Sequence, residues 1–184
     1  YTPLNNYDSL YTTCGKTSSF PSEICTFCLN FSDFIMQISE AVFAEKRHIM
    51  IYGIGCDLCD TARMAKSLGG PHGSTFAARV FGPAEREALG LSEGNSSPLS
   101  AHKAASAAAD FAAKEAFLKA AGTGLAGPFA LCEIEAVRLE SGAPEYRFSG
   151  GSAQWMDEHH LRAKLSLSHD GGMALAFCIL ETET

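Results

Sequence analysis

The chain has 184 residues, of which 46% are hydrophobic and 10% aromatic, and this is enough to bury a core in one main domain. Its 14 basic and 21 acidic residues give a formal net charge of -7, which argues against non-specific binding of nucleic acid. No apolar run approaches the length of a membrane-spanning helix, so we expect neither a nucleic-acid nor a membrane partner.

The first 49 residues differ in composition from the rest of the chain. They are rich in Ser, Thr, Asn and Phe, and residues 31–43 have a pattern that suits an amphipathic helix. Their flanks lack the basic segment and the small-residue cleavage site of a signal peptide. We expect residues 1–49 to be an N-terminal extension without catalytic role, either disordered or non-native sequence read through from a misassigned start. Residues 50–184 are expected to form the folded domain.

From Met50 onward, hydrophobic periodicity and turn residues predict strands alternating with helices. In chain order we expect a strand at 51–57, helices at 60–68, 83–90 and 101–121, strands at 129–139 and 145–149, a helix at 152–162, and strands at 164–168 and 173–180. Ser100 caps the long alanine-rich helix and Gly122 stops it. This order indicates an α+β fold, with helices packed on an antiparallel sheet.

Seven cysteines allow a metal or redox hypothesis. Cys25-x-x-Cys28 and Cys56-x-x-Cys59 could form a four-thiolate zinc site, but the segment between the pairs exceeds the usual spacing of about 15–20 residues. Cys56 and Cys59 are better explained as small apolar residues that flank Asp57. The odd number of cysteines and the lack of a secretion signal favour reduced thiols and a cytoplasmic location.

The strongest chemical signal lies on the long helix. Glu115 and Lys119 are four positions apart and share a helix face, and Asp57 at the end of the first strand could join them. Each group has an ordinary alternative, because a Glu–Lys pair at this spacing is usually solvated and an Asp after a strand often caps the next helix. In the same way, His169 could be an exposed turn residue, and Gly122-Thr123-Gly124 could be only a helix stop.

Three segments together resemble one family. They are Gly53-Ile-Gly55-Cys-Asp57-Leu with Arg63 six residues after the aspartate, Phe111-Ala-Ala-Lys114-Glu115-Ala-Phe-Leu-Lys119-Ala-Ala-Gly122-Thr123-Gly124, and Ser166-Leu-Ser-His169. This pattern is similar to that of the holo-acyl-carrier-protein synthase family, the small-subunit class of 4′-phosphopantetheinyl transferases. The resemblance covers residues 50–181, and the central segment is its most specific part.

The resemblance implies that residues 50–184 form a compact transferase-type α+β domain that assembles as a homotrimer. It implies Mg²⁺-dependent transfer of 4′-phosphopantetheine from coenzyme A to a serine of an apo acyl carrier protein, with release of adenosine 3′,5′-bisphosphate. Magnesium prefers oxygen ligands, which Asp57 and Glu115 would supply. Glu115, a water on the metal and His169 are candidates for the general base.

The other site residues also follow from the resemblance. Lys119 and His169 would contact coenzyme A and take part in catalysis, and Arg63 and Lys66 would dock the acidic carrier protein. Further contacts with coenzyme A would come from Lys114, Gly122, Thr123 and Gly124.

One position departs from the family pattern. Many members carry Arg directly before the Phe-Ala-x-Lys-Glu segment, whereas this chain has Asp110. If that Arg meets a phosphate of coenzyme A, the contact is missing here unless Arg79 or Lys103 replaces it. Two other functions are compatible with the sequence: a non-catalytic module of the same fold that binds coenzyme A or a metal, and a CxxC zinc or redox protein.

Overall fold

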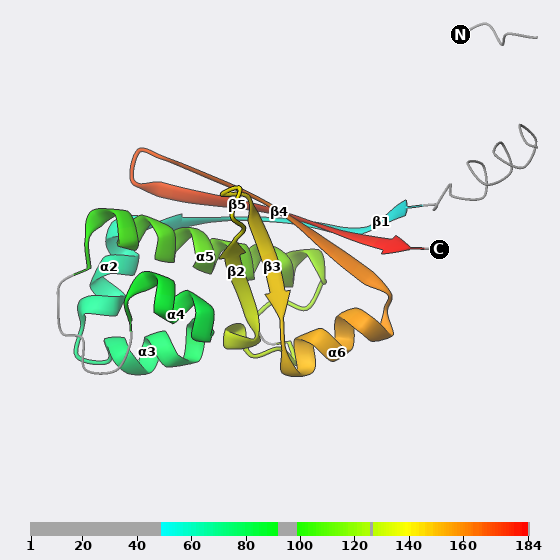
Figure 1. Cartoon of the computed structure of the whole chain (residues 1–184), viewed down its shortest axis with the longest axis horizontal. Helices are drawn as coiled ribbons and strands as arrows, with labels where there is room; N and C mark the ends of the chain where they lie inside the picture. The colour runs from blue at the N-terminus through cyan, green and yellow to red at the C-terminus, as the bar shows by residue number, and fades with distance from the viewer. Residues whose placement is uncertain (1–48, 92–98, 126, 184) are drawn as a thin grey trace, which may run out of the picture. The chain divides into compact units, whose positions relative to one another are not determined.

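Three long antiparallel strands form the main sheet (Figure 1). The computed structural model describes residues 49–91, 99–125 and 127–183, so nearly all of the proposed extension lies outside the described residues. The strands are β1 (Ile49–Asp60), β4 (Leu161–Asp170) and β5 (Met173–Glu183), in the order β1-β5-β4. The last strand in the sequence is therefore the central strand of the sheet.

One face of this sheet is covered by α5 (Ala101–Ala120). Alternate residues of β5, from Ala174 to Leu180, are fully buried, as is the alanine-rich side of α5 that includes Ala112 and Ala116. In a strand every second side chain points to the same face, so these buried residues of β5 form the face that packs against α5. Small side chains on both surfaces let the helix and sheet approach closely.

The closest approach is between β1 and α5, where two glycines leave room for the helix backbone. A methyl group at Gly53 would collide with the carbonyl oxygen of Ala120, and one at Gly55 would collide with that of Ala116. Gly53, Gly55 and Asp57 are alternate residues of one strand and lie on the same face. The glycines therefore bring Asp57 against the C-terminal half of α5.

The described residues also form a second, two-stranded sheet and five shorter helical segments. The hairpin consists of β2 (Ile134–Arg138) and β3 (Pro144–Phe148). The helical segments are α2 (Thr61–Gly69), α3 (Gly73–Val80), α4 (Pro83–Leu89), the 3-10 turn η1 (Leu131–Glu133) and α6 (Gly150–Glu158). Figure 1 shows α2, α3 and α4 gathered near the first half of α5, with α6 near the other end. No helix in the described ranges is long and apolar enough to cross a membrane.

The predicted α+β fold, with helices on an antiparallel sheet, is confirmed, and most elements lie where the sequence places them. Two predictions were wrong, and one helix was missed. The strand expected at 129–139 is shorter, because its first part forms η1. The helix expected at 152–162 ends at Glu158, and His160, whose φ is 51°, leads into β4. Helix α3 was missed, since it begins at Gly73, a residue of low helix propensity.

We predict that Gly55→Ala lowers the free energy of unfolding by about 3 kcal/mol, because the added methyl group meets a backbone carbonyl that cannot move without displacing α5. Gly69→Ala is the matched control, since a methyl group there meets nothing within 4 Å. Urea unfolding of both variants measures the difference. Equal stability of the two variants would contradict the close contact between β1 and α5.

Candidate active site

The ion pair between Lys119 and Asp57 joins α5 to β1. Lys119 Nζ donates to Asp57 Oδ1 at 2.8 Å and to the carbonyl oxygen of Cys56 at 2.9 Å. The side chain of Lys119 is 50% exposed and that of Asp57 is 17% exposed. The hydrogen bond to Asp57 is the main cause that raises the pKa of Lys119. A positive group thus lies at the surface, directed onto a carboxylate that is largely enclosed.

Glu115, one helical turn before Lys119, belongs to the same cluster. Partial burial raises the pKa of Glu115, and the negative charge of Asp57 raises it further, while Lys119 and Arg63 oppose the shift. An effect of this kind requires the two carboxylates to be close in space. The packing of Gly55 against Ala116 and the hydrogen bond from Lys119 to Asp57 place these two carboxylates, 58 positions apart in the sequence, at the same β1–α5 contact. Their role as metal ligands stays a prediction.

Asp57 is not the cap of the following helix. Asp60 takes that position, and its Oδ1 accepts the backbone N–H of Arg63 at 2.8 Å. The ordinary explanation of Asp57 as a helix cap is therefore wrong. The side chains of Arg63 and Lys66 are exposed on α2, and Arg63 is close enough to Glu115 to influence its pKa. A basic helix thus borders the acidic pair.

Lys114 lies in the core and not in this surface cluster. Its side chain is fully buried, and Nζ donates to Glu85 Oε2 at 2.7 Å, to the carbonyl oxygen of Leu131 at 3.2 Å and to that of Ile134. With three acceptors already engaged, the ammonium group has no face turned to solvent. The structure thus gives Lys114 a structural place in this protomer, and the expected contact with coenzyme A has no support there.

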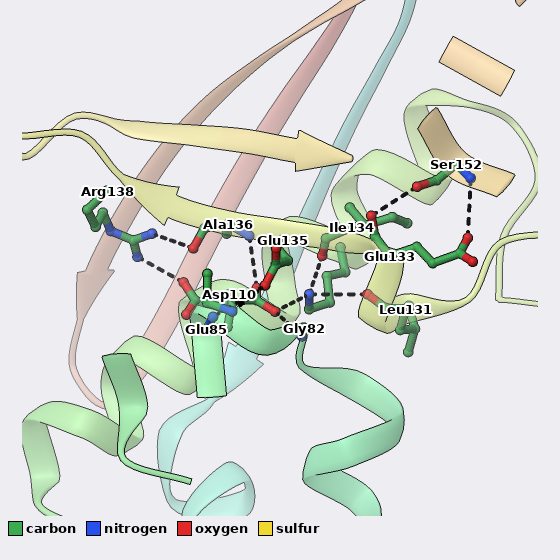
Figure 2. Close-up of polar contacts among 12 residues, drawn as sticks. Gly82, Glu85, Asp110, Leu131, Glu133, Ile134, Glu135, Ala136, Arg138 and Ser152 are labelled. Carbon is green, nitrogen blue, oxygen red and sulfur yellow. Dashed lines mark hydrogen bonds and ion pairs between the residues drawn. The ribbon is translucent and has the colours of Figure 1, made fainter. Parts of the chain in front are cut away.

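The partner of Lys114 is equally enclosed (Figure 2). Glu85 accepts the backbone N–H groups of Gly82 and Ala136, each at 2.8 Å, in addition to Lys114. Burial raises the pKa of Glu85 to about 7, against the opposing charge of Lys114, and burial likewise lowers the pKa of Lys114. Three donors on one carboxylate favour its charged form, so we regard the contact as a buried ion pair.

The loop after α5 caps the helix through hydrogen bonds from its backbone amides. Gly122 and Gly124 have φ values of 73° and 61°, which a residue with a side chain adopts only at a cost. The N–H groups of Thr123 and Gly124 donate to the carbonyl oxygen of Leu118, and the N–H of Gly122 donates to the carbonyl oxygen of Lys119. These three amides cannot also bind a phosphate without breaking the helix cap, so the expected phosphate contact of residues 122–124 has no support here.

His169 lies apart from the acidic pair within the protomer. It is the penultimate residue of β4, and β5 separates it from β1. Two strand spacings correspond to roughly 10 Å. His169 lines a cavity with His102, Ser106 and Arg138 instead. Its expected part in catalysis stays a prediction.

The CxxC pairs do not form a site within the described residues. Cys25 and Cys28 lie outside them. Cys56 and Cys59 are three positions apart on β1 and therefore point to opposite faces of the strand; Cys56 is exposed and Cys59 is buried. The apolar packing predicted for this pair holds for Cys59 alone. Cys56, Cys59, Cys132 and Cys178 are free thiols, and a cytoplasmic location stays a prediction.

Asp110, where an arginine was expected, has its own arginine partner. Arg138 on β2 donates from Nη2 to Asp110 Oδ1 at 2.9 Å, and the Asp110 side chain is almost completely buried. Burial raises the pKa of Asp110, and the charge of Arg138 opposes this shift. Within the described residues, the basic group that pairs with Asp110 is Arg138, not Arg79 or Lys103. Sequence reasoning missed this pair because no pattern links positions 28 residues apart.

The comparison with known proteins decides the family. A family model described as the 4′-phosphopantetheinyl transferase superfamily matches residues 53–178. The chain belongs to this superfamily. The match begins at Gly53 and spans Asp57, Glu115 and Lys119, so it includes the whole cluster. The resemblance inferred from the sequence is therefore confirmed.

The relatives and solved structures compared below are all holo-acyl-carrier-protein synthases. The chain is 42% identical over 137 residues to a holo-[acyl-carrier-protein] synthase of Methylobacterium radiotolerans, covering 72% of this chain and 94% of the relative. Among solved structures, the synthase of Neisseria meningitidis is 33% identical with a TM-score of 0.59, covering 72% of this chain and all of that one. A synthase of Bacillus anthracis str. Ames, solved in complex with CoA, is 29% identical with a TM-score of 0.56. The match covers 73% of this chain and 99% of that one.

Lys114 and Lys119, both on α5, should differ in how much they contribute to the stability of the fold. We predict that Lys114→Met lowers the free energy of unfolding by about 3–5 kcal/mol, because it leaves the Glu85 carboxylate buried without its cation. Lys119→Met should change it by less than about 1 kcal/mol, since that ion pair is exposed. Chemical denaturation of both variants tests this. A Lys114 variant as stable as the wild type would show that the buried pair does not hold α4 and β2 to α5.

Proposed function

We propose that this protein transfers the 4′-phosphopantetheine group of coenzyme A to a serine hydroxyl of an apo acyl carrier protein. The observation that carries the proposal is the cluster of Asp57, Glu115 and Lys119, found in a chain of the phosphopantetheinyl transferase superfamily. The name of its relatives and the coenzyme in a related structure support the same substrates.

The reaction exchanges one phosphorus–oxygen bond for another. The serine oxygen bonds to the phosphorus that carries pantetheine, and the pyrophosphate bond on the other side of this phosphorus breaks. Adenosine 3′,5′-bisphosphate leaves with the electron pair. Negative charge develops on the leaving oxygen, and Lys119, exposed at the mouth of the cluster, is placed to neutralise charge on the phosphates.

Glu115, or a water that it would hold on the metal, is our choice for the group that accepts the serine proton. Burial and the adjacent Asp57 both raise its pKa, and a carboxylate with a raised pKa is a better proton acceptor near neutral pH. Asp57, by contrast, accepts a hydrogen bond from Lys119 Nζ at 2.8 Å. The two carboxylates thus differ in environment in the way that distinct roles require.

The same two carboxylates suit a hard divalent cation. Within the described residues, no three His, Cys, Asp or Glu side chains are arranged so that they could hold a metal ion. In phosphate chemistry, however, Mg²⁺ commonly uses one or two carboxylates and completes its shell with water and substrate. Asp57 and Glu115 repel one another in the protein alone, and a cation between them would relieve that repulsion. When bound, Mg²⁺ would orient the pyrophosphate and offset its charge.

The exposed apolar face of the sheet supports assembly into the expected homotrimer. Ile54, Leu58, Leu175 and Phe177 all retain 40% or more of their surface and, as alternate residues of adjacent strands, lie on the face opposite α5. A large exposed apolar patch usually marks an interface. Contact between subunits would also allow His169 of one copy to approach the acidic pair of another.

Carrier-protein docking is assigned to α2. Arg63 and Lys66 are exposed there, and the helix has no acidic residue in its first turn. Arg63 is near Glu115, so a partner that contacts α2 is brought beside the cluster. An acidic carrier would be attracted to this helix although the chain as a whole is acidic.

The function is tested by incubating the full-length protein with Mg²⁺, coenzyme A and an apo carrier protein, and measuring the carrier's mass. We predict a gain of one phosphopantetheine per carrier, and a loss of at least about 100-fold in rate for Asp57→Ala and Glu115→Ala. Asp157→Ala, an exposed acid on α6, is the control that keeps full activity. A folded wild type that modifies none of several carriers would contradict the proposal and favour a non-catalytic binding module.

Arg63→Ala should raise the Michaelis constant for the carrier protein roughly 10-fold and leave that for coenzyme A unchanged, because Arg63 acts on the protein partner. Arg63→Lys keeps the charge and should show a smaller rise. Initial rates at varied carrier concentration separate these effects. A change confined to coenzyme A would place Arg63 in the nucleotide site and remove α2 as the docking surface.

A further inference from the structure

The hydroxyl group of Tyr146 lies where β3, α5 and β5 meet. It donates to the carbonyl oxygen of Ala113 on α5 at 2.6 Å, in a hydrogen bond that is buried. It is also hydrogen-bonded to the thiol of Cys178 on β5. A phenol has one proton to donate, and this proton is directed at Ala113, so the thiol donates to the phenol oxygen. One side-chain oxygen thus connects three elements inside the core.

The ring that carries this hydroxyl is held by other aromatic rings. Tyr146 stacks on Phe148 with ring centroids 5.6 Å apart, and it packs against Phe117 of α5 with centroids 5.9 Å apart. Phe117 in turn contacts Phe129 and Trp155. A side chain enclosed by rings in this way cannot change its rotamer without disturbing the core. The fold itself therefore fixes the position of the hydroxyl.

Both partners of the hydroxyl adjoin the close contact between β1 and α5. Cys178 is the cross-strand partner of Gly55, and a methyl group at Gly55 would collide with the carbonyl oxygen of Ala116. Ala113 lies three positions before Ala116 on α5, so these two residues are neighbours on the helix surface. The hydroxyl therefore bonds to the helix and to the sheet beside the point where their backbones touch.

We propose that Tyr146 is a positioning residue for the cation site: its hydroxyl fixes the distance between α5 and the sheet, and so the separation of Asp57 and Glu115. This inference rests on the proposed function. Asp57 lies two positions after Gly55 on β1. Glu115 lies two positions after Ala113 on α5. Two carboxylates share one Mg²⁺ only if an oxygen of each lies about 2.0–2.1 Å from it, so even a small shift between strand and helix weakens the site.

The hydroxyl takes no part in the chemistry itself. Tyr146 is 8% exposed, and its proton is bonded to a backbone carbonyl oxygen. Burial raises the pKa of Tyr146 above its ordinary value, so the phenol stays neutral near neutral pH and gives no proton to the reaction. Tyr146 therefore acts through the backbone of α5, and its removal should change the geometry of the site and not its donors.

The test is Tyr146→Phe in the full-length protein, because this change removes the hydroxyl and keeps the ring. We expect it to weaken Mn²⁺ binding roughly 3-fold to 10-fold, as measured by electron paramagnetic resonance of free Mn²⁺. The rate of transfer to the carrier protein should fall by a similar factor when Mg²⁺ is limiting and recover when Mg²⁺ is in excess. Cys178→Ala, which removes only the bond to β5, should cause a smaller loss of Mn²⁺ affinity.

Ser152→Ala is the matched control for a loss of stability alone. The Ser152 hydroxyl is also buried and hydrogen-bonds to the backbone carbonyl oxygens of Glu133 and Ser149, but it belongs to α6 and not to the contact between β1 and α5. Both variants should unfold at lower urea concentration than the wild type, whereas Ser152→Ala should bind Mn²⁺ as the wild type does.

Weaker Mn²⁺ binding in Tyr146→Phe alone supports the inference. Wild-type affinity in Tyr146→Phe overturns it, as does an equal loss in Ser152→Ala or a wild type that binds no Mn²⁺. The mass assay on the carrier protein is independent of this result: a wild type that binds Mn²⁺ but transfers nothing would contradict the proposed function alone.

Discussion

The active-site geometry depends on how closely β1 lies against α5. Gly53 and Gly55 have no side chain on the face where the carbonyl oxygens of Ala120 and Ala116 approach, so strand and helix pack backbone to backbone. Any larger residue would separate them. Since Asp57 continues the same face of the strand, this contact sets where its carboxylate lies relative to Glu115 and Lys119, one turn apart on the helix. The function proposed for the cluster therefore rests on a packing constraint that involves none of its charged groups.

Burial separates the roles of two lysines that are only five positions apart. Lys114 is directed into the core, where Glu85 and two carbonyl oxygens surround it. Lys119 lies in the last turn of α5, where a cation is favoured by the helix dipole, and it remains half exposed. The same helix thus anchors α4 and β2 through Lys114 and carries a half-exposed cation, Lys119, near its C-terminal end. The Asp110–Arg138 pair also joins a buried group to an accessible one, because the buried carboxylate of Asp110 holds the partly exposed guanidinium of Arg138.

Local sequence patterns predicted those features of the site that depend on residues close together in the chain. The spacing of Glu115 and Lys119 fixed their common face, and the strand that carries Asp57 was recognised from its apolar run. The same motif could not show that Lys114 is buried, because its partners Glu85 and Ile134 come from distant segments. Nor could it show that the amides of residues 122–124 are used to cap α5. Gly53 and Gly55 looked like weak signals in the sequence, since their purpose is visible only when α5 lies against them. The Asp110–Arg138 pair was missed for the same reason.

The central claim is that Asp57 and Glu115 hold one cation together. Manganese, a hard divalent ion with similar oxygen preference, allows this to be measured directly by electron paramagnetic resonance of free Mn²⁺ in titrations of the full-length protein. The account predicts that Asp57→Asn and Glu115→Gln each weaken binding strongly, and that the double variant binds no more weakly than the weaker single variant, because either loss removes the shared site. Losses that add independently, or a single variant that binds as the wild type does, would contradict the claim.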